Sequence, residues 1–215
     1  MKLNMAYRVY VAGALLCASL GAGAAVVVAP TGISASTADF GGGFALIKQI
    51  NQSGLSAAYT PGVTDFDSFV ASTTHNGAGA SNSGFSVGPL GTFTYALGGP
   101  LAISGIGLWE TRNSGSVLGF NLYADDDSIL GNGALLIGAF TAIASGAAIS
   151  SGQSFGFGSV SAQFVHMEIQ TTDGGFQPGL GEVVFRSGQS VPEPTTLALV
   201  GLAIAAAGLS RRRAR

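Results

Sequence analysis

Cysteine is almost absent from this 215-residue chain. Its one cysteine, Cys17, lies in an apolar N-terminal segment, and residues 25–190 contain none. Disulfide bonds therefore cannot stabilise this middle part, and a folded state must rely on a hydrophobic core. Its 166 residues (190 − 25 + 1) are enough for one domain of ordinary size to bury such a core.

Basic side chains are also scarce between residues 25 and 190. Only Lys48, Arg112 and Arg186 are basic there, against ten aspartates and glutamates, so the net charge of this part is 3 − 10 = −7. The whole chain has a net charge of −2, because most of its basic residues lie near its two ends. A surface of negative sign repels phosphates, which argues against nucleic acid as a partner. It suits cations or neutral partners such as glycans.

Metal-protease and nucleotide-binding motifs are lacking too. Residues 25–190 contain two histidines, His75 and His166, but no H-E-x-x-H motif and no P-loop. His75 lies in a run of small and polar residues, 72–83, which is typical of a surface loop. We therefore predict that the protein is not an enzyme. A pair of carboxylates for glycan cleavage stays open as an alternative, because the spacing of the ten acidic residues neither selects nor excludes a pair.

The N-terminus has the parts of a secretory signal peptide. Lys2 and Arg8 supply the positive charge, residues 9–20 are apolar, and Ala22, Gly23 and Ala24 form a small-residue cleavage site. The segment is shorter than a typical transmembrane helix and has different flanks. We therefore predict that residues 1–24 are a signal peptide and that the protein is exported.

The C-terminus combines an apolar run with a basic end. Residues 195–209 carry no charge and are followed by Arg211, Arg212, Arg213 and Arg215. A helix of this length rises roughly 22 Å, somewhat less than the ~30 Å hydrocarbon core of a bilayer. A buried core helix is the alternative, but an arginine cluster favours a transmembrane helix whose basic end stays cytoplasmic.

Pro192, Glu193 and Pro194 stand just before this apolar run. The resulting tripartite tail, residues 191–215, resembles the PEP-CTERM sorting signal. The resemblance implies that an exosortase-type membrane enzyme is a partner and removes the tail after transient anchoring in the inner membrane. The mature protein would then reach the cell surface or the exterior. PEP-CTERM proteins are associated with bacteria that produce exopolysaccharide.

The pattern between the two ends predicts an all-β fold. Residues 92–97, 118–122 and 164–170 alternate apolar and polar side chains, as half-buried strands do. Residues 103–109, 135–140, 154–157 and 182–185 read as further strands. The 29 glycines of this part (34 in the chain, less 5 at its ends) fit turns and bulges between short strands. We predict one antiparallel, jelly-roll-like β-sandwich over residues 25–190, with residues 45–50 as a short helix or strand.

The closing residues carry a second resemblance. Discoidin-like, galactose-binding-like jelly-roll domains end with a strand, a loop that contains glycine and a final strand. This closing segment is similar to Val165–Ile169, Gly174–Gly175 and Gly179–Phe185. His166 and Gly181 depart from this pattern, because the family usually has arginine and serine there. The resemblance covers roughly residues 60–187 and implies a non-catalytic module that binds glycans, lipid head groups or matrix proteins.

Many members of that family hold a structural calcium ion, and the resemblance implies three metal ligands here. Glu182 matches the glutamate before the last strand, and Asp65 and Asp67 are candidate early-loop ligands. The plain alternative is that both aspartates simply face solvent. The densest acidic run, residues 125–127, lacks EF-hand spacing, and we interpret it as an acidic turn.

Trp109 and His166 are the candidate ligand contacts. Trp109 is the only tryptophan, and a tryptophan face can stack on a sugar ring; by alternation it also fits the opposite packing layer. His166 is predicted on the outward face of its strand. The sequence thus favours an exported module associated with polysaccharide or matrix. A structural surface protein without a specific ligand is the runner-up, and a glycan-cleaving enzyme is third.

Overall fold

The computed structural model describes residues 24–77, 82–88, 90–111, 115–174 and 177–188. Residues 25–189 form one compact unit. The predicted signal peptide and the predicted sorting tail with its transmembrane helix lie outside the described residues. Within the described ranges, no helix is long and apolar enough to cross a membrane.

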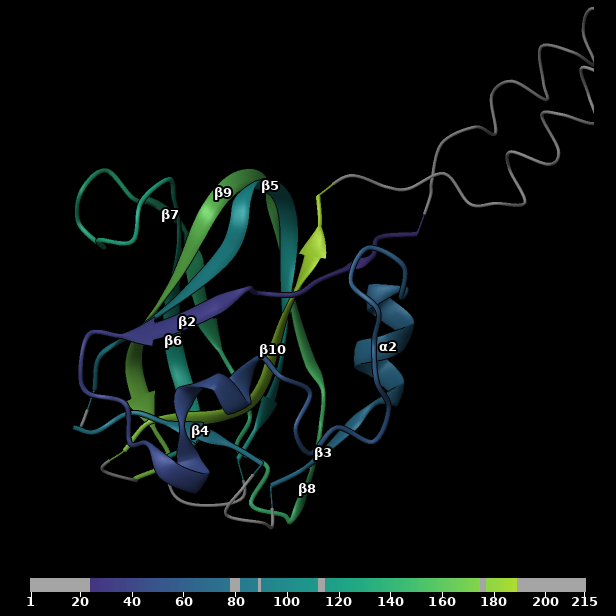
Figure 1. The fold of residues 1–215 in the computed structure, drawn as a ribbon, viewed down its shortest axis with the longest axis vertical. Coiled ribbons are helices and arrows are strands. Elements are labelled where there is room, and N and C mark those ends of the chain that lie inside the picture. The colour runs from purple at the N-terminus through teal and green to yellow at the C-terminus, as the bar shows by residue number, and fades with distance from the viewer. Residues whose placement is uncertain (1–23, 78–81, 89, 112–114, 175–176, 189–215) are drawn as a thin grey trace, which may run out of the picture. The chain divides into compact units, whose positions relative to one another are not determined.

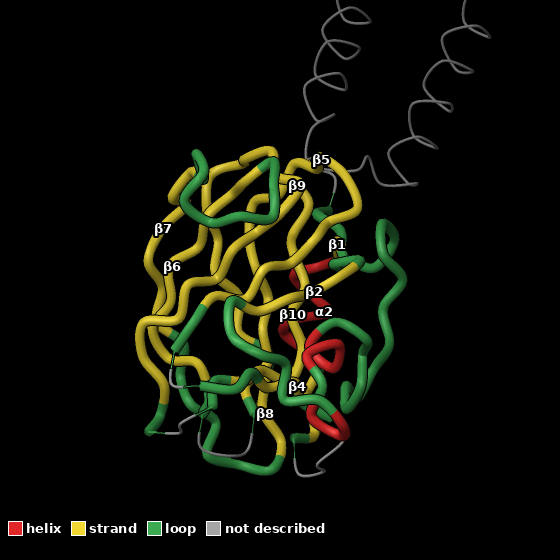
Figure 2. Tube along the Cα trace, turned by 60° about the vertical axis from the view of Figure 1, so that its left-hand side comes forward, coloured by secondary structure: helices red, strands yellow, loops and turns green. Residues whose placement is uncertain are grey.

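Strands make up most of the described unit (Figures 1 and 2). They are β1 (Val27–Val28), β2 (Gly32–Ala35), β3 (Thr74–Asn76), β4 (Gly84–Phe85), β5 (Thr92–Glu110), β6 (Val117–Asp125), β7 (Leu135–Thr141), β8 (Ile149–Ser151), β9 (Gln153–Thr172) and β10 (Gly179–Ser187). The helical elements are α2 (Phe66–Ser72) and two 3-10 turns, η1 (Gly42–Phe44) and η2 (Leu46–Gln49). All pairings between these named strands are antiparallel, which confirms the predicted fold class.

The main sheet has the strand order β1-β10-β5-β9-β6-β7, with β2 beside β5 and β4 beside β10. Strands β3 and β8 form a separate two-stranded sheet. In Figure 1, the long strands β5 and β9 arch over at the top of the domain. Two distant parts of each strand therefore lie in different layers, and one continuous sheet builds both layers of the sandwich.

The bend in β5 and β9 follows from their pairing. Thr92 pairs with Glu168, and Ile106 pairs with Phe155, so the two long strands run side by side through the bend. The register shifts between Ala96 and Leu101, where the pairing is irregular. Gly98 lies inside this interval with φ of +79°, a conformation that L side chains rarely adopt.

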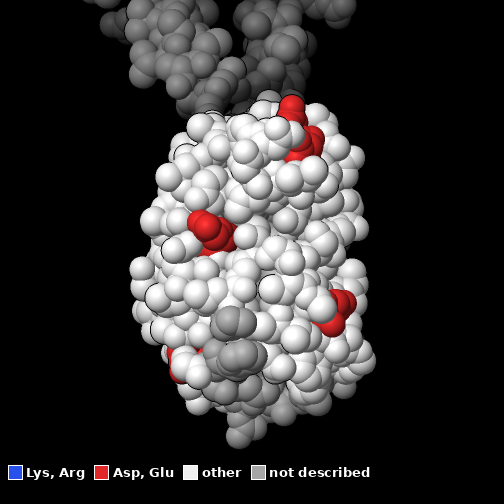
Figure 3. All heavy atoms as spheres, turned by 90° about the vertical axis from the view of Figure 1, so that its left-hand side faces the viewer, with Lys and Arg blue, Asp and Glu red and all other residues white. Residues whose placement is uncertain are grey.

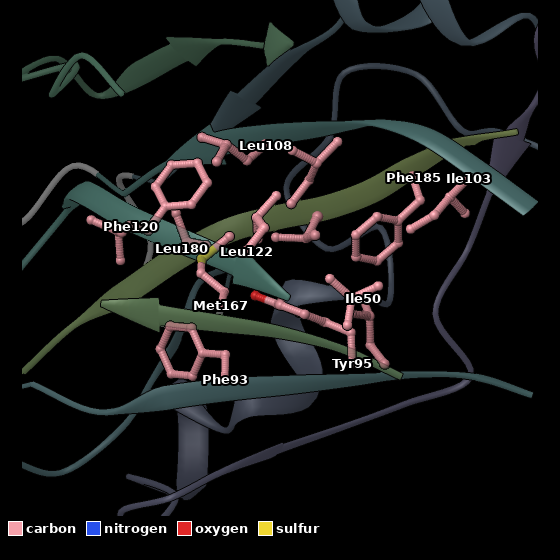
Figure 4. Close-up of a cluster of buried hydrophobic side chains, with 14 of the residues drawn as sticks. Ile50, Phe93, Tyr95, Ile103, Leu108, Phe120, Leu122, Met167, Leu180 and Phe185 are labelled. Carbon is pink, nitrogen blue, oxygen red and sulfur yellow. The ribbon is translucent and has the colours of Figure 1, made fainter. Parts of the chain in front are cut away.

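The main core lies between the two layers (Figure 4). The first half of β5 contributes Phe93 and Tyr95, the second half contributes Ile106 and Leu108, and β10 adds Phe185. All five side chains are fully buried. Alternation along each strand sends every second side chain to this side, as the sequence pattern predicts.

A second, smaller core lies on the other side of β10 and β5, beneath helix α2. Phe66, Phe69 and Val70 recur at the spacing of one helix face and pack with Trp109 and Val184. The sequence analysis placed Asp65 and Asp67 in an early loop, which is wrong for Asp67, because a short helix begins at Phe66. Residues 46–49, within the 45–50 predicted as a short helix or strand, are a 3-10 turn.

Candidate functional site

Trp109, the first predicted ligand contact, lies in the second core. Its side chain is fully buried, and its ring packs edge to face on Phe69 with centroids 5.7 Å apart. The indole Nε1–H donates to the backbone oxygen of Thr73 at 2.9 Å. A buried ring offers no face to a sugar, so the alternative of Trp109 as a ligand platform is wrong, and the alternative that places it in the opposite packing layer is confirmed. Helix α2, which the strand pattern did not reveal, covers this side of the sheet.

His166, the second predicted contact, is also fully buried, although its strand pattern predicted an outward position. Its Nδ1 lies 2.9 Å from Thr94 Oγ1, and its Nε2 lies 3.3 Å from Asp125 Oδ2. Strand β5 thus supplies a hydrogen-bond partner for Nδ1, and β6 places a carboxylate at ion-pair distance from Nε2, without hydrogen-bond geometry. His166 therefore links its own strand to two neighbouring strands in the interior and is not a surface ligand contact.

Asp65 and Asp67 are occupied by local structural interactions. Asp65 is the N-cap of α2 and accepts a hydrogen bond from the backbone N–H of Ser68 at 2.8 Å. Hydrogen bonding by Ser68, first through its side chain and then through its backbone N–H, lowers the pKa of Asp65. Asp67 forms an ion pair with Arg186, with 2.9 Å between Oδ2 and Nη2. Neither aspartate is grouped with Glu182 into a three-ligand metal cluster within the described ranges.

Glu182, the third predicted metal ligand, is a fully buried carboxylate on β10. It accepts a hydrogen bond from Tyr59 Oη at 3.0 Å and one from the backbone N–H of Gln52 at 2.9 Å. Burial raises the pKa of Glu182 to about 8, although both hydrogen bonds act to lower it. Both donors are neutral, so they stabilise the charged carboxylate less than a cation would. Burial and the negative Glu182 also raise the pKa of Tyr59.

Glu110 is a second buried carboxylate, on β5. Burial, reinforced by the negative charge of Asp173, raises the pKa of Glu110 to about 9, while the nearby Ser116 hydroxyl and Val117 N–H act to lower it. Among the described residues, no donor near either carboxylate oxygen has both the distance and the angles of a hydrogen bond. Burial keeps both Glu110 and Glu182 away from any polymer at the surface.

His75 lies in β3 and is fully buried, so its predicted position in a surface loop is wrong. Its Nε2 lies 2.9 Å from the backbone oxygen of Ser53 and 3.0 Å from that of Asn82. Burial lowers the pKa of His75 despite these contacts. A neutral imidazole that donates to these two backbone oxygens fits a structural role that joins β3 to the segments of Ser53 and Asn82.

Two short G-x-S-x-G sequences occur, at residues 84–88 and 152–156. A nucleophile elbow needs its serine on a sharp turn between a strand and a helix. Ser86 instead forms an isolated bridge with Asp39, and Ser154 lies within β9 opposite Gly107. Neither serine therefore has the setting of a catalytic nucleophile.

The acidic run at residues 125–127 begins at the last residue of β6. Asp125 Oδ1 accepts hydrogen bonds from the backbone N–H groups of Asp126 and Asp127, and Asp127 Oδ1 accepts one from Ile129. In the described part of the chain, this run is the one group of three histidine, cysteine, aspartate or glutamate side chains close enough together to hold a metal ion. The hydrogen bonds to backbone N–H groups fit the acidic turn predicted from the sequence.

A polar group on the outer face of β6 and β9 was not identified from the sequence. Tyr123 Oη donates to Glu168 Oε2 at 3.0 Å, and Asn121 Nδ2 donates to the same oxygen at 3.1 Å. All three side chains are partly exposed. The signal was present, because the inward positions of Phe120 and Leu122 place Asn121 and Tyr123 outward. We call Asn121, Tyr123 and Glu168 the sheet-face triad.

The sheet-face triad combines the groups that recognise sugars. A tyrosine ring is an apolar surface with a polar tip, and amide and carboxylate groups hydrogen-bond hydroxyls. The hydrogen bond with Glu168 raises the pKa of Tyr123, which keeps its phenol protonated and able to donate. Of the groups described above, this triad is the one with both aromatic and polar atoms at the surface.

Comparison with known proteins identifies the tail. Residues 190–213 match the family model of the PEP-CTERM protein-sorting motif, which confirms the resemblance of Pro192, Glu193 and Pro194 and the following arginines. Such a motif indicates an exported protein that is sorted by an exosortase. The match covers the tail and does not extend into residues 25–189. No curated protein matches the chain.

Solved structures identify the fold of the domain. A chitosan-binding module from a chitosanase/glucanase of Paenibacillus sp. IK-5 superposes with a TM-score of 0.52 at 14% identity, covering 76% of this chain and 99% of that one. The two family 32 carbohydrate-binding modules (CBM32) of Clostridium perfringens ZmpB give 0.53 at 11% identity, covering 76% and 37%. The domain therefore has the CBM32-type jelly-roll fold, which confirms the discoidin-like resemblance.

Proposed function

We propose that residues 25–189 form a non-catalytic module that binds polysaccharide at the bacterial surface or in an extracellular matrix. The proposal rests on one observation above all: a carbohydrate-binding-module fold whose partly exposed sheet face presents Tyr123, Asn121 and Glu168. The negative charge of this part favours a neutral or cationic polymer. Chitosan, the ligand of one structural neighbour, is a polymer of this kind.

The sorting motif suggests where in the cell envelope this module is located. An exosortase would remove the tail near Pro192, Glu193 and Pro194 after the signal peptide has directed export. The module would then be released or attached at the cell surface, where exopolysaccharide is available. Biofilm matrix is the setting in which such a polymer-binding module would act.

The experiment is a binding assay on purified residues 25–189. A glycan array that includes chitosan oligomers and the producing organism's own polysaccharide would identify the ligand. Affinity electrophoresis would then compare the wild type with Tyr123→Ala and Glu168→Gln. Losing the ring or the charged acceptor should weaken binding at least about tenfold, equivalent to ~1.4 kcal/mol.

The matched control is Val63→Ala, because Val63 is 73% exposed and lies outside the sheet face. It should bind like the wild type. Equal binding by all three variants would place the ligand elsewhere on the module. Binding to no polymer, including the organism's own, would favour a structural surface protein. Shortening of the polymer during incubation would favour an enzyme.

We also propose that Glu182 is a ligand of a structural calcium ion. Its buried carboxylate receives only neutral hydrogen-bond donors, Tyr59 Oη and Gln52 N–H, and a bound cation would offset the cost of burying its charge. Asp65 and Asp67 are occupied by Ser68 and Arg186, so they are weaker candidates than the sequence analysis assumed. Oxygen atoms of the loop that contains Gln52 would complete the ligand set.

A further inference from the structure

A long part of this domain carries no formal charge. Residues 128–167 contain no lysine, arginine, aspartate or glutamate, so all 13 such residues of the 25–189 part (3 basic, 10 acidic) lie outside this stretch. The stretch forms β7, β8, most of β9 and their connections. Figure 3 shows the side towards which β7 lies in Figure 1, and the described surface there is largely uncharged, with scattered acidic groups and no basic one.

Strand β7 is the last strand of the main sheet. In the described sheet it pairs with β6 alone, so its other edge has no strand partner. The first half of β9 likewise pairs with β5 on one side only. Half-buried phenylalanines fill the space between these two edges, because Phe140 of β7 packs against Phe155 and Phe157 of β9.

The side chains on and beside this edge are apolar and exposed. Leu135 is 60% exposed, Leu136 is 55% exposed and Ile143 is 77% exposed. Natural proteins protect sheet edges with charged residues, proline or bulges, because an open edge pairs with other strands. Here neither charge nor proline protects β7, and only an irregularity in its register near Ile137 interrupts it.

We propose that β7 is an interface at which two copies of this chain pair, antiparallel and edge to edge. A strand of this kind is complementary to itself across a two-fold axis, which is the commonest symmetry of protein dimers. Each copy carries −7 on residues 25–190, so two copies repel one another wherever their charged surfaces meet. The uncharged edge is the part of the described surface where approach carries the least repulsion.

This charge distribution favours a second copy over other occupants. A charged protein partner would find no opposite charge along residues 128–167. A sugar chain needs exposed ring faces or several polar groups, whereas the exposed side chains at this edge, apart from Thr141, are leucine, isoleucine and alanine. The sheet-face triad adjoins β7, because Ala139 pairs with Asn121, but dimerisation uses the free edge of β7 and not the sheet face that carries the triad.

Sedimentation equilibrium of residues 25–189 tests the proposal, because these residues form a compact unit with their own cores. The wild type should show a concentration-dependent dimer that strengthens with added salt, since salt screens the repulsion between copies. Ala139→Lys places a charge at an exposed position near the middle of β7 and should weaken dimerisation at least about tenfold. Its thermal midpoint should stay close to that of the wild type.

Val63→Lys is the matched control, because it adds the same charge at an exposed position outside the stretch. It should leave the dimer unchanged. Hydrogen exchange at low and high protein concentration should protect the amides of β7 and leave those of β1, the opposite end of the sheet order, unaffected. A wild type that stays monomeric at high concentration and high salt, or a dimer that is unaffected by Ala139→Lys, would overturn the proposal.

Discussion

Gly181 lies against the imidazole ring of His75. A Cβ atom at position 181 would come within 2.5 Å of Nδ1 and 2.6 Å of Cε1 of that ring. His75 is fully buried and belongs to β3, whereas Gly181 belongs to β10. The contact explains why glycine stands where discoidin-like domains usually have serine, because this chain fills the same space with a histidine.

We therefore expect Gly181→Ala to destabilise the domain. Extra volume in a close-packed interior costs about 1–3 kcal/mol, which is several degrees of the thermal midpoint for a domain of this size. Calorimetry of residues 25–189 would measure the shift. The control is Gly156→Ala, because no atom lies within 4 Å of a Cβ there. Equal midpoints for the two variants would show that the His75 ring moves aside at no cost.

Stability should fall as pH rises from about 5 to 8. The pKa of Glu182 is about 8 and that of Glu110 is about 9 in the folded state, against an ordinary value of 4.5. Between these values the folded state holds protons that the unfolded state has lost. Each group therefore lowers the free energy of unfolding by up to about 1.4 kcal/mol per pH unit.

Urea titrations at pH 5, 6.5 and 8 would measure this dependence. Glu182→Gln and Glu110→Gln each remove one ionisation, so each should flatten the profile and leave the variant relatively more stable at pH 8. A profile that rises from pH 5 to pH 8 would contradict the raised pKa values of both carboxylates.

Calcium should stabilise the domain most clearly near pH 8. An ion that binds only the folded state raises the thermal midpoint as its concentration increases. Millimolar calcium should raise the midpoint, chelator should reverse the change, and Glu182→Gln should abolish it. If Glu182→Gln keeps the full shift, the ion binds elsewhere, and the acidic run at residues 125–127 would be the next site to test. An unchanged midpoint in the wild type would leave Glu182 without a metal role.

The fluorescence of Trp109 should report a buried ring. It is the only tryptophan, and its side chain is fully buried. We expect blue-shifted emission and little quenching by iodide in the folded domain. Trp109→Ala should cost about 3–5 kcal/mol, as truncation of a buried large aromatic side chain does. Strong quenching that a glycan relieves would instead return Trp109 to the ligand site.

The exported protein should lack its tail. Intact mass spectrometry of the surface or secreted form should show a chain that begins near Ala25 and ends near Pro192, Glu193 and Pro194. Replacing Pro192, Glu193 and Pro194 together by alanine should retain the longer form in the membrane. An exported wild-type protein that still carries residues 197–215 would mean that the tail is a permanent anchor.

Much of this protein is determined by its sequence directly. The PEP-CTERM motif is a contiguous signal that an enzyme reads, so it needs no tertiary structure to be recognised. The fold class also follows from the sequence, because the alternation in residues 92–97 and 164–170 is local and reports which side of a strand is buried. That alternation correctly placed Phe93, Tyr95, Val165 and Met167 in the core.

Only the tertiary structure decided which polar and aromatic side chains are buried and which are exposed. A strand has two sides, and alternation cannot tell a side facing water from one facing a second packing element. Helix α2 covers Trp109, and Thr94 with Asp125 encloses His166, so both predicted ligand contacts became interior residues. The elements that cover Trp109 and His166 come from distant parts of the chain, so the local sequence left both alternatives open for Trp109 and gave no sign that His166 is buried.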